Sequence, residues 1–182
     1  MQREWSAFVA RRNPDVLEER NLDDFLFGAQ RIGLERVRSP LRLLQDGRCF
    51  YCRVQLTGAP HVDHFLPWSR SSDNGVDNLV AAHASCNRAK KASLAAVGHL
   101  QRWVERNADD RLTELADDAG WPRSKERTHN TARAVYLWAP PGTLLWRDRD
   151  EFEPIDGLLV TAMLGARDRL PLAAEDGERY ER

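Results

Sequence analysis

Two pairs of potential metal ligands constrain this fold more than any other feature of the sequence. Cys49 and Cys52 are separated by two residues, and after thirty intervening residues His83 and Cys86 repeat that spacing. Such pairs can hold a tetrahedral Zn²⁺ from two sides, one pair from a tight turn and the other from a helix start. Disulfides are disfavoured, because the cysteine count of three is odd and the N-terminus has no secretory signal. We therefore expect a structural zinc site that ties two distant segments together.

A rival ligand set combines Cys49 and Cys52 with His61 and His64 in a compact finger. Its Cys-to-His spacer and its His-x2-His step are both shorter than such fingers usually have. It would also leave His83 and Cys86 without a role as metal ligands. The remaining alternative is two buried cysteines and an unrelated histidine. We favour the first set because both of its pairs have the spacing of a metal clip.

Composition and charge place this metal site in a globular protein. The chain has 182 residues, of which 42% are hydrophobic and 30% charged, a balance typical of one soluble domain or one core with additions. No apolar run approaches the roughly 20 residues of a membrane span, so we expect no membrane association and a cytoplasmic location. The net charge is -1, but residues 48–106 carry eight Lys or Arg against four Asp or Glu, a local balance of +4. We expect the chemistry of the protein in this central segment.

Hydrophobic periodicity predicts helices on both sides of an irregular centre, and hence an α+β protein. We expect three regions: a helical segment over 1–46, a core over 47–106, and a helical extension with a small hairpin over 107–182. Helices are expected over 15–32, from Ser39-Pro40 to just before Gly47, over 84–91, through 94–104, and over 109–118, 124–138 and 158–164. Strands are expected over 54–56 and 62–66, a hairpin from 144–146 and 151–153, and a frayed tail over 175–182. Trp103 and Trp138 are expected in the core, and Trp68 beneath a loop.

A second group of residues lies between and beside the metal ligands. It comprises His61-Val62-Asp63-His64, then Asn78-Leu79 after a polar loop, and then a basic segment from Asn87 to Lys91. In this order, the chain resembles the HNH nuclease family, whose ββα-metal motif has a cysteine knuckle, an Asp-His at a strand end, an Asn after a loop and a second metal-binding pair. The resemblance covers about residues 47–93. It implies a ββα-metal core embedded in helices from both flanks.

The resemblance also implies a role for each residue of the motif. Asp63 and Asn87 would hold a catalytic Mg²⁺ or Mn²⁺ through oxygen atoms, and His64 would be the general base. Asn78 would support the loop by side-chain hydrogen bonds. Asn87 stands where many family members have histidine, and an oxygen ligand favours Mg²⁺ or Mn²⁺ over other metals.

Basic residues follow the second metal-binding pair directly. We expect Arg88, Lys90 and Lys91 to contact phosphates, the alternative being an ordinary solvated face. His61 is interpreted as a strand or loop residue without a catalytic role, and His99 and His129 as structural or exposed.

The function that the resemblance implies is metal-dependent hydrolysis of phosphodiester bonds in nucleic acid, preferably DNA, leaving a 5'-phosphate and a 3'-hydroxyl. The alternatives are a catalytically silent, zinc-stabilised nucleic-acid-binding module and a domain whose helical flanks bind a protein. Asp63 beside His64 favours the enzyme, since a silent module needs no acid next to a base. An upstream domain or a partner subunit could direct or restrain the nuclease, and bacterial defence is one setting that would suit it.

Overall fold

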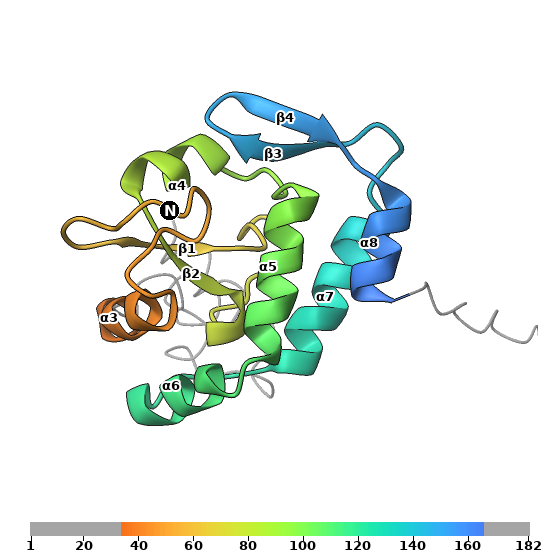
Figure 1. Ribbon diagram of the computed structural model, residues 1–182. Helices are drawn as coiled ribbons and strands as arrows, with labels where there is room; N and C mark the ends of the chain where they lie inside the picture. The colour runs from red at the N-terminus through yellow and green to blue at the C-terminus, as the bar shows by residue number, and fades with distance from the viewer. Residues whose placement is uncertain (1–33, 166–182) are drawn as a thin grey trace, which may run out of the picture.

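A small antiparallel strand pair lies at the centre of the computed structural model, which describes residues 34–165 (Figure 1). Along the chain the elements are α3 (Glu35–Leu44), β1 (His61–His64), the 3₁₀ helix η2 (Val76–Asn78), β2 (Leu79–Ala82), α4 (Ala84–Lys90), α5 (Val97–Ala108), α6 (Arg111–Ala119), α7 (Lys125–Leu137), β3 (Leu144–Asp148), β4 (Glu151–Pro154) and α8 (Gly157–Leu164). These helices and strand pairs confirm the expected α+β class.

The ββα unit consists of β1, β2 and α4. In the β1–β2 register, Asp63 is opposite Val80 and His61 is opposite Ala82. All four residues of β2 are buried, and a single residue, His83, separates β2 from α4. Since α4 packs back against β1, residues from the strand end and from the helix lie in the same part of the molecule.

The helix α5 connects this unit to the C-terminal elements through buried aromatic side chains. Trp103 on α5 is fully buried and stacks on Phe65 with ring centroids 5.0 Å apart. Its indole nitrogen donates to the Asp77 carbonyl over 2.8 Å. On the other side, α8 packs against α5 and α7, as Figure 1 shows. Burial of this apolar surface is the main force holding the flanking helices to the ββα unit.

The hairpin β3–β4 is joined to the core by backbone hydrogen bonds. Trp146 donates its N–H to the Leu94 carbonyl and accepts one from the Ala96 N–H, both over 2.7 Å. These contacts cross the expected boundary near residue 106, as does α5 itself. The division into 1–46, 47–106 and 107–182 stays a prediction.

Several expected elements are confirmed to within a few residues. They are the helices expected over 84–91, 109–118, 124–138 and 158–164 and the hairpin near 144–153. The helix expected through 94–104 begins only at Val97, after Leu94. The expected helix over 15–32 and the tail over 175–182 lie outside the described residues. Within residues 34–165 no helix has the length and apolar character to cross a membrane.

The predicted start of the first described helix was wrong. Ser39-Pro40 lies inside α3, which begins four residues earlier at Glu35. Pro40 supplies no N–H for a hydrogen bond within the helix. However, Val37 and Leu41 are one turn apart and both fully buried. Packing of this face against α6 and β2 outweighs the cost of the proline, because tertiary packing supplies most helix stability.

The strand expected over 54–56 was also wrong. This segment forms only an isolated bridge between Gln55 and Arg48, and its Val54 side chain is exposed. The segment expected at 62–66 is strand over 61–64 instead, and its partner is β2.

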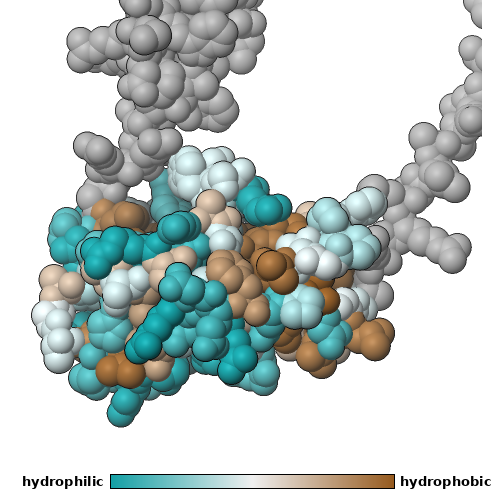
Figure 2. All heavy atoms as spheres, turned by 90° about the horizontal axis from the view of Figure 1, so that it is seen from above, coloured by the Kyte–Doolittle hydropathy of each residue, from teal (hydrophilic) through white to brown (hydrophobic). Residues whose placement is uncertain are grey.

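Exposed apolar side chains accompany the C-terminal elements. Figure 2 shows apolar residues gathered toward one side of the face in view and hydrophilic residues over most of the rest. Trp138, which follows α7, is 64% exposed, so its expected place in the core was wrong. It ends α7 as the C-cap residue.

Candidate active site and metal centre

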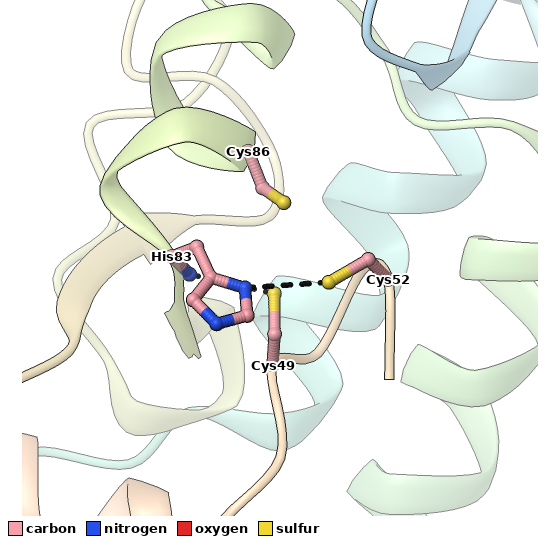
Figure 3. Close-up of side chains that lie close together, drawn as sticks. All are labelled: Cys49, Cys52, His83 and Cys86. Carbon is pink, nitrogen blue, oxygen red and sulfur yellow. Dashed lines mark hydrogen bonds between the residues drawn. The ribbon is translucent and has the colours of Figure 1, made fainter. Parts of the chain in front are cut away.

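The four expected metal ligands lie together in the structure. The ligand atoms of Cys49, Cys52, His83 and Cys86 are all within 4.8 Å of one another, and Figure 3 shows the side chains converging from two segments. One pair sits on a turn closed by the hydrogen bond from the Arg53 N–H to the Cys49 carbonyl. The other pair flanks the start of α4. The preferred set therefore converges as expected, and among residues 34–165 His61 and His64 do not belong to such a group with Cys49 and Cys52.

The His83 ring is oriented for metal binding. Its Nδ1 lies 3.3 Å from the Cys52 sulfur, while its Nε2 lies 3.2 Å from the Gln55 carbonyl oxygen. A carbonyl only accepts, so Nε2 carries the hydrogen and Nδ1 keeps a lone pair directed at the sulfur atoms. A hydrogen bond of this kind to the second ring nitrogen commonly fixes a metal-bound histidine.

The thiols of this group interact electrostatically as well. Burial raises the pKa of Cys86 to about 12, and the neighbouring Cys49 and Cys52 add to the effect. Three sulfur atoms and one imidazole nitrogen are a donor set suited to a thiophilic divalent cation, whose charge favours the thiolate form.

A second cluster surrounds Asp63 on β1. The Tyr51 hydroxyl donates to Asp63 Oδ2 over 2.5 Å, and Lys90 Nζ lies 3.2 Å from the same oxygen. Burial raises the pKa of Tyr51, and the Asp63 charge raises it further, so the phenol stays protonated and donates. Burial also lowers the pKa of Lys90, while the Asp63 charge opposes that shift. The carboxylate is therefore held from its inner side by two side chains that are almost completely removed from water.

The expectation that Lys90 contacts a phosphate was wrong. Its side chain is 0% exposed, and its ammonium donates to the His64 carbonyl over 2.9 Å as well as pairing with Asp63. Arg88 and Lys91, by contrast, are exposed. Lys90 lies one helical turn after the buried Cys86 and shares its inward face, which explains the difference.

His64 has a side-chain partner that the sequence did not reveal. Its Nε2 lies 2.8 Å from Asn74 Oδ1, and its ring contacts that of Trp68 edge to face, with centroids 5.3 Å apart. Asn74 belongs to the polar stretch Ser69–Asn74, whose composition indicates a loop and gives no sign of which member faces a histidine.

Asn78 closes the loop that follows β1. Its buried side chain accepts from the Leu66 N–H over 2.8 Å, and its amide donates to the carbonyls of Leu66 and Asp73 over 3.2 and 3.0 Å. These hydrogen bonds join the two ends of the loop. Side-chain hydrogen bonds of this kind are what the expected role of Asn78, support of the loop, requires.

Asn87 faces β1 from the first turns of α4. Its Nδ2 lies 3.5 Å from Nδ1 of His61, which is exposed. His61, interpreted from the sequence as a residue without a catalytic role, thus lies next to one of the expected metal ligands.

The start of α7 and the residues just before it hold the same loop through two buried carboxylates. Asp77 accepts from Arg123 Nε and from the Ser124 N–H, each over 3.0 Å. Asp73 accepts from the Thr128 hydroxyl over 2.5 Å and pairs with Arg127 over 3.2 Å. Nothing in the local sequence indicates these partners, because about fifty residues separate them.

The other two histidines have structural surroundings. His99 is buried, and its Nε2 lies 2.7 Å from the Arg147 carbonyl oxygen. His129 stacks parallel to Trp103 with centroids 6.5 Å apart. Both agree with their interpretation as residues outside the site.

Comparison with protein families agrees with this architecture. Residues 51–96 match the family model described as HNH endonuclease, about a quarter of the chain, and this range contains β1, β2 and α4. A comparison with curated proteins found no match.

Proposed function

We propose that this chain, whose central segment carries the HNH endonuclease motif, hydrolyses phosphodiester bonds in nucleic acid, preferably DNA. The observation that carries the proposal is the juxtaposition of β1 and α4. Asp63 and His64 end one strand, the helix that bears Asn87 packs against it, and the Cys₃His group lies at the start of that helix. Each chemical role then falls to a residue of this unit.

In the proposed reaction His64 takes a proton from a water molecule that attacks phosphorus. An imidazole suits this step because its ordinary pKa lies near neutrality. The P–O3' bond breaks, so that the products are a 5'-phosphate and a 3'-hydroxyl. Asn78 keeps the loop after β1 closed, and so helps to hold His64 in place.

Asp63 and Asn87 are proposed to hold a catalytic Mg²⁺ or Mn²⁺. Within residues 34–165, both polar contacts of the Asp63 carboxylate are made to Oδ2, which leaves Oδ1 for a cation. Asn87 directs its amide nitrogen at His61, and its Oδ1 remains as a ligand atom. A carboxylate and an amide oxygen fit these hard cations. When bound, such a cation stabilises charge on the phosphoryl oxygens and on the departing 3'-oxygen.

Zn²⁺ is proposed for the Cys₃His group. Four converging ligands with no position left for a substrate are typical of structural sites. Its role would be to fasten the turn at Cys49 to the helix that carries Asn87.

Arg88 and Lys91 are proposed as phosphate contacts. Both are exposed on or just after α4, close in sequence to Asn87. Contacts of this kind position the nucleic acid without reading its sequence.

A silent nucleic-acid-binding module is the second candidate. It is favoured by one observation, the Lys90 ammonium beside Asp63, which already balances the carboxylate charge. In a silent module this ion pair would be purely structural.

Cleavage of supercoiled plasmid in Mg²⁺, Mn²⁺ or EDTA separates the two candidates. The enzyme should produce nicked or linear DNA with either metal and none in EDTA. Asp63→Ala and Asn87→Ala should lose cleavage while retaining zinc and DNA binding. DNA binding with no metal-dependent cleavage would instead support the silent module.

A further inference from the structure

We propose that Asn74 is a positioning residue that fixes the His64 ring in one tautomer, and that the segment between α6 and α7 holds Asn74 in place. This inference rests on the proposed function of His64 as general base. It assigns a part of the reaction machinery to the C-terminal extension, which lies beyond the family match ending at residue 96.

The contact between the two side chains defines the tautomer. Asn74 Oδ1 is a carbonyl oxygen and can only accept, so the His64 Nε2 atom 2.8 Å away must carry the hydrogen. In the neutral ring the other nitrogen, Nδ1, is then the unprotonated one. That is the atom able to take a proton from water, so the contact prepares His64 for the base role.

Asn74 is held by contacts to its own backbone and to its neighbours. The Trp121 indole N–H donates to the Asn74 carbonyl over 2.8 Å, and the Val76 N–H donates to the Pro122 carbonyl over 3.0 Å. Trp121 is only 7% exposed. Asn74 itself and Val76 are therefore tied to the connection between α6 and α7.

Asp73 supplies a second anchor next to Asn74. Its Oδ1 accepts from the Gly75 N–H over 2.8 Å, which folds the loop around Asn74. A Cβ atom at Gly75 would lie 2.9 Å from this same oxygen, so a larger residue at this position would displace the Asp73 carboxylate. The other carboxylate oxygen accepts from Thr128 on α7. Movement of α7 relative to the ββα unit would thus shift the hydrogen-bond partner of His64.

These contacts link α7 to the base through the Asp73 side chain, the backbone from Asp73 to Asn74, and the Asn74 side chain. They also explain why the loop after β1 has buried acidic residues in a stretch that looks like solvated linker. An orienting partner of this kind is commonly worth a factor of about 10 to 100 in activity, by analogy with the outer-shell partners of bound histidines.

The first test measures the tautomer directly and needs no variant of Asn74. The full chain, loaded with zinc and labelled with ¹⁵N-histidine, is observed by NMR at about pH 8.5, above the ordinary histidine pKa of about 6.5. The His64 signals are assigned by their loss in His64→Ala. We expect His64 to show a protonated Nε2 and a bare Nδ1. A His64 ring protonated at Nδ1, or an even mixture of tautomers, would overturn the proposal.

The second test compares substitutions at Asn74. Asn74→Ala should give a mixture of tautomers and lower kcat by about 10- to 100-fold, with little change in KM. Asn74→Asp should retain the Nε2–H form and recover most of the rate, because a carboxylate also accepts from Nε2–H. Asn130→Ala, at an exposed position of α7, serves as the matched control and should change neither readout.

The outcomes separate this inference from the proposed function. If His64→Ala abolishes cleavage but Asn74→Ala retains both the rate and the tautomer, the inference fails and the base assignment stands. If His64→Ala cuts as fast as the unmodified chain, the base assignment itself fails. Should Asn74→Ala not fold, the tautomer of the unmodified chain and the rate of Asn74→Asp still decide the question.

Discussion

Lys90 Nζ lies 3.2 Å from Asp63 Oδ2, and the two side chains are 0% and 11% exposed. The proposed metal ligand therefore has a buried ammonium beside Oδ2, whereas Oδ1 makes no polar contact within residues 34–165. Removing one partner of a buried pair leaves an uncompensated charge, which is far more costly than losing an exposed pair.

Replacement of Lys90 should show how much the buried ion pair with Asp63 stabilises the fold. Lys90→Met keeps most of the side-chain volume and should lower the free energy of unfolding by about 3 kcal/mol in EDTA-treated buffer that leaves zinc bound. Millimolar Mg²⁺ should recover part of the loss, since a divalent cation can compensate Asp63. Urea denaturation with and without Mg²⁺ measures both quantities.

The matched control is Lys91→Met, at the exposed neighbouring position, where a change within about 0.5 kcal/mol is expected. Equal losses for both variants would show that the buried ion pair does not stabilise the fold.

Removal of the metal from the Cys₃His group should unfold the ββα unit. Structural zinc contributes on the order of 10 kcal/mol to small zinc domains, and here it would join the turn at Cys49 to α4. Purified protein should contain about one tightly bound zinc, measured by elemental analysis. A strong chelator, or the substitution Cys49→Ser, should cause loss of helical signal in circular dichroism.

Ser85→Ala provides the control for that experiment, because Ser85 lies between the ligands on α4 and is exposed. Folded, zinc-free protein would contradict the structural role.

Much of this site could be predicted from sequence spacing. The x2 spacing of the ligand pairs identified the Cys₃His group. The order of Asp63, Asn78 and Asn87 carries the resemblance to the HNH family, and that resemblance implied the ββα unit. The contacts of Tyr51 with Asp63 and of Arg123 with Asp77 could not be predicted in this way. They join segments that only the tertiary fold brings together.

Lys90 is an intermediate case. It was grouped with Arg88 and Lys91 because of its charge, yet it lies four residues after the ligand Cys86. Positions four apart share one face of a helix, so its inward direction was readable from the sequence. Its positive charge, however, favoured an exposed phosphate contact. The local sequence also gives no sign that Asp63 pairs with Lys90 and so compensates the cost of burying its charge.

Substitution of the exposed basic residues should weaken DNA binding without changing its specificity. Log affinity should fall with log salt with a slope of about -0.9 per phosphate contact. Arg88→Ala and Lys91→Ala should each reduce the magnitude of that slope by about one unit. Fluorescence anisotropy over a salt series, on two DNA duplexes of unrelated sequence, provides the measurement.

Lys125→Ala, at an exposed position of α7 outside the ββα unit, is the control and should leave the slope unchanged. If all three variants behave alike, α4 does not form the phosphate-binding surface.

The central claim, that His64 acts as general base in a metal-dependent nuclease, is tested most directly by His64→Ala. A time course of supercoiled plasmid in Mg²⁺ is compared with that of the unmodified chain, with zinc content and DNA affinity measured in the same buffer. We predict a fall in the cleavage rate of about 10² to 10⁴-fold, the usual contribution of a positioned base, with zinc and affinity nearly unchanged. Cleavage by His64→Ala at the rate of the unmodified chain would contradict the account.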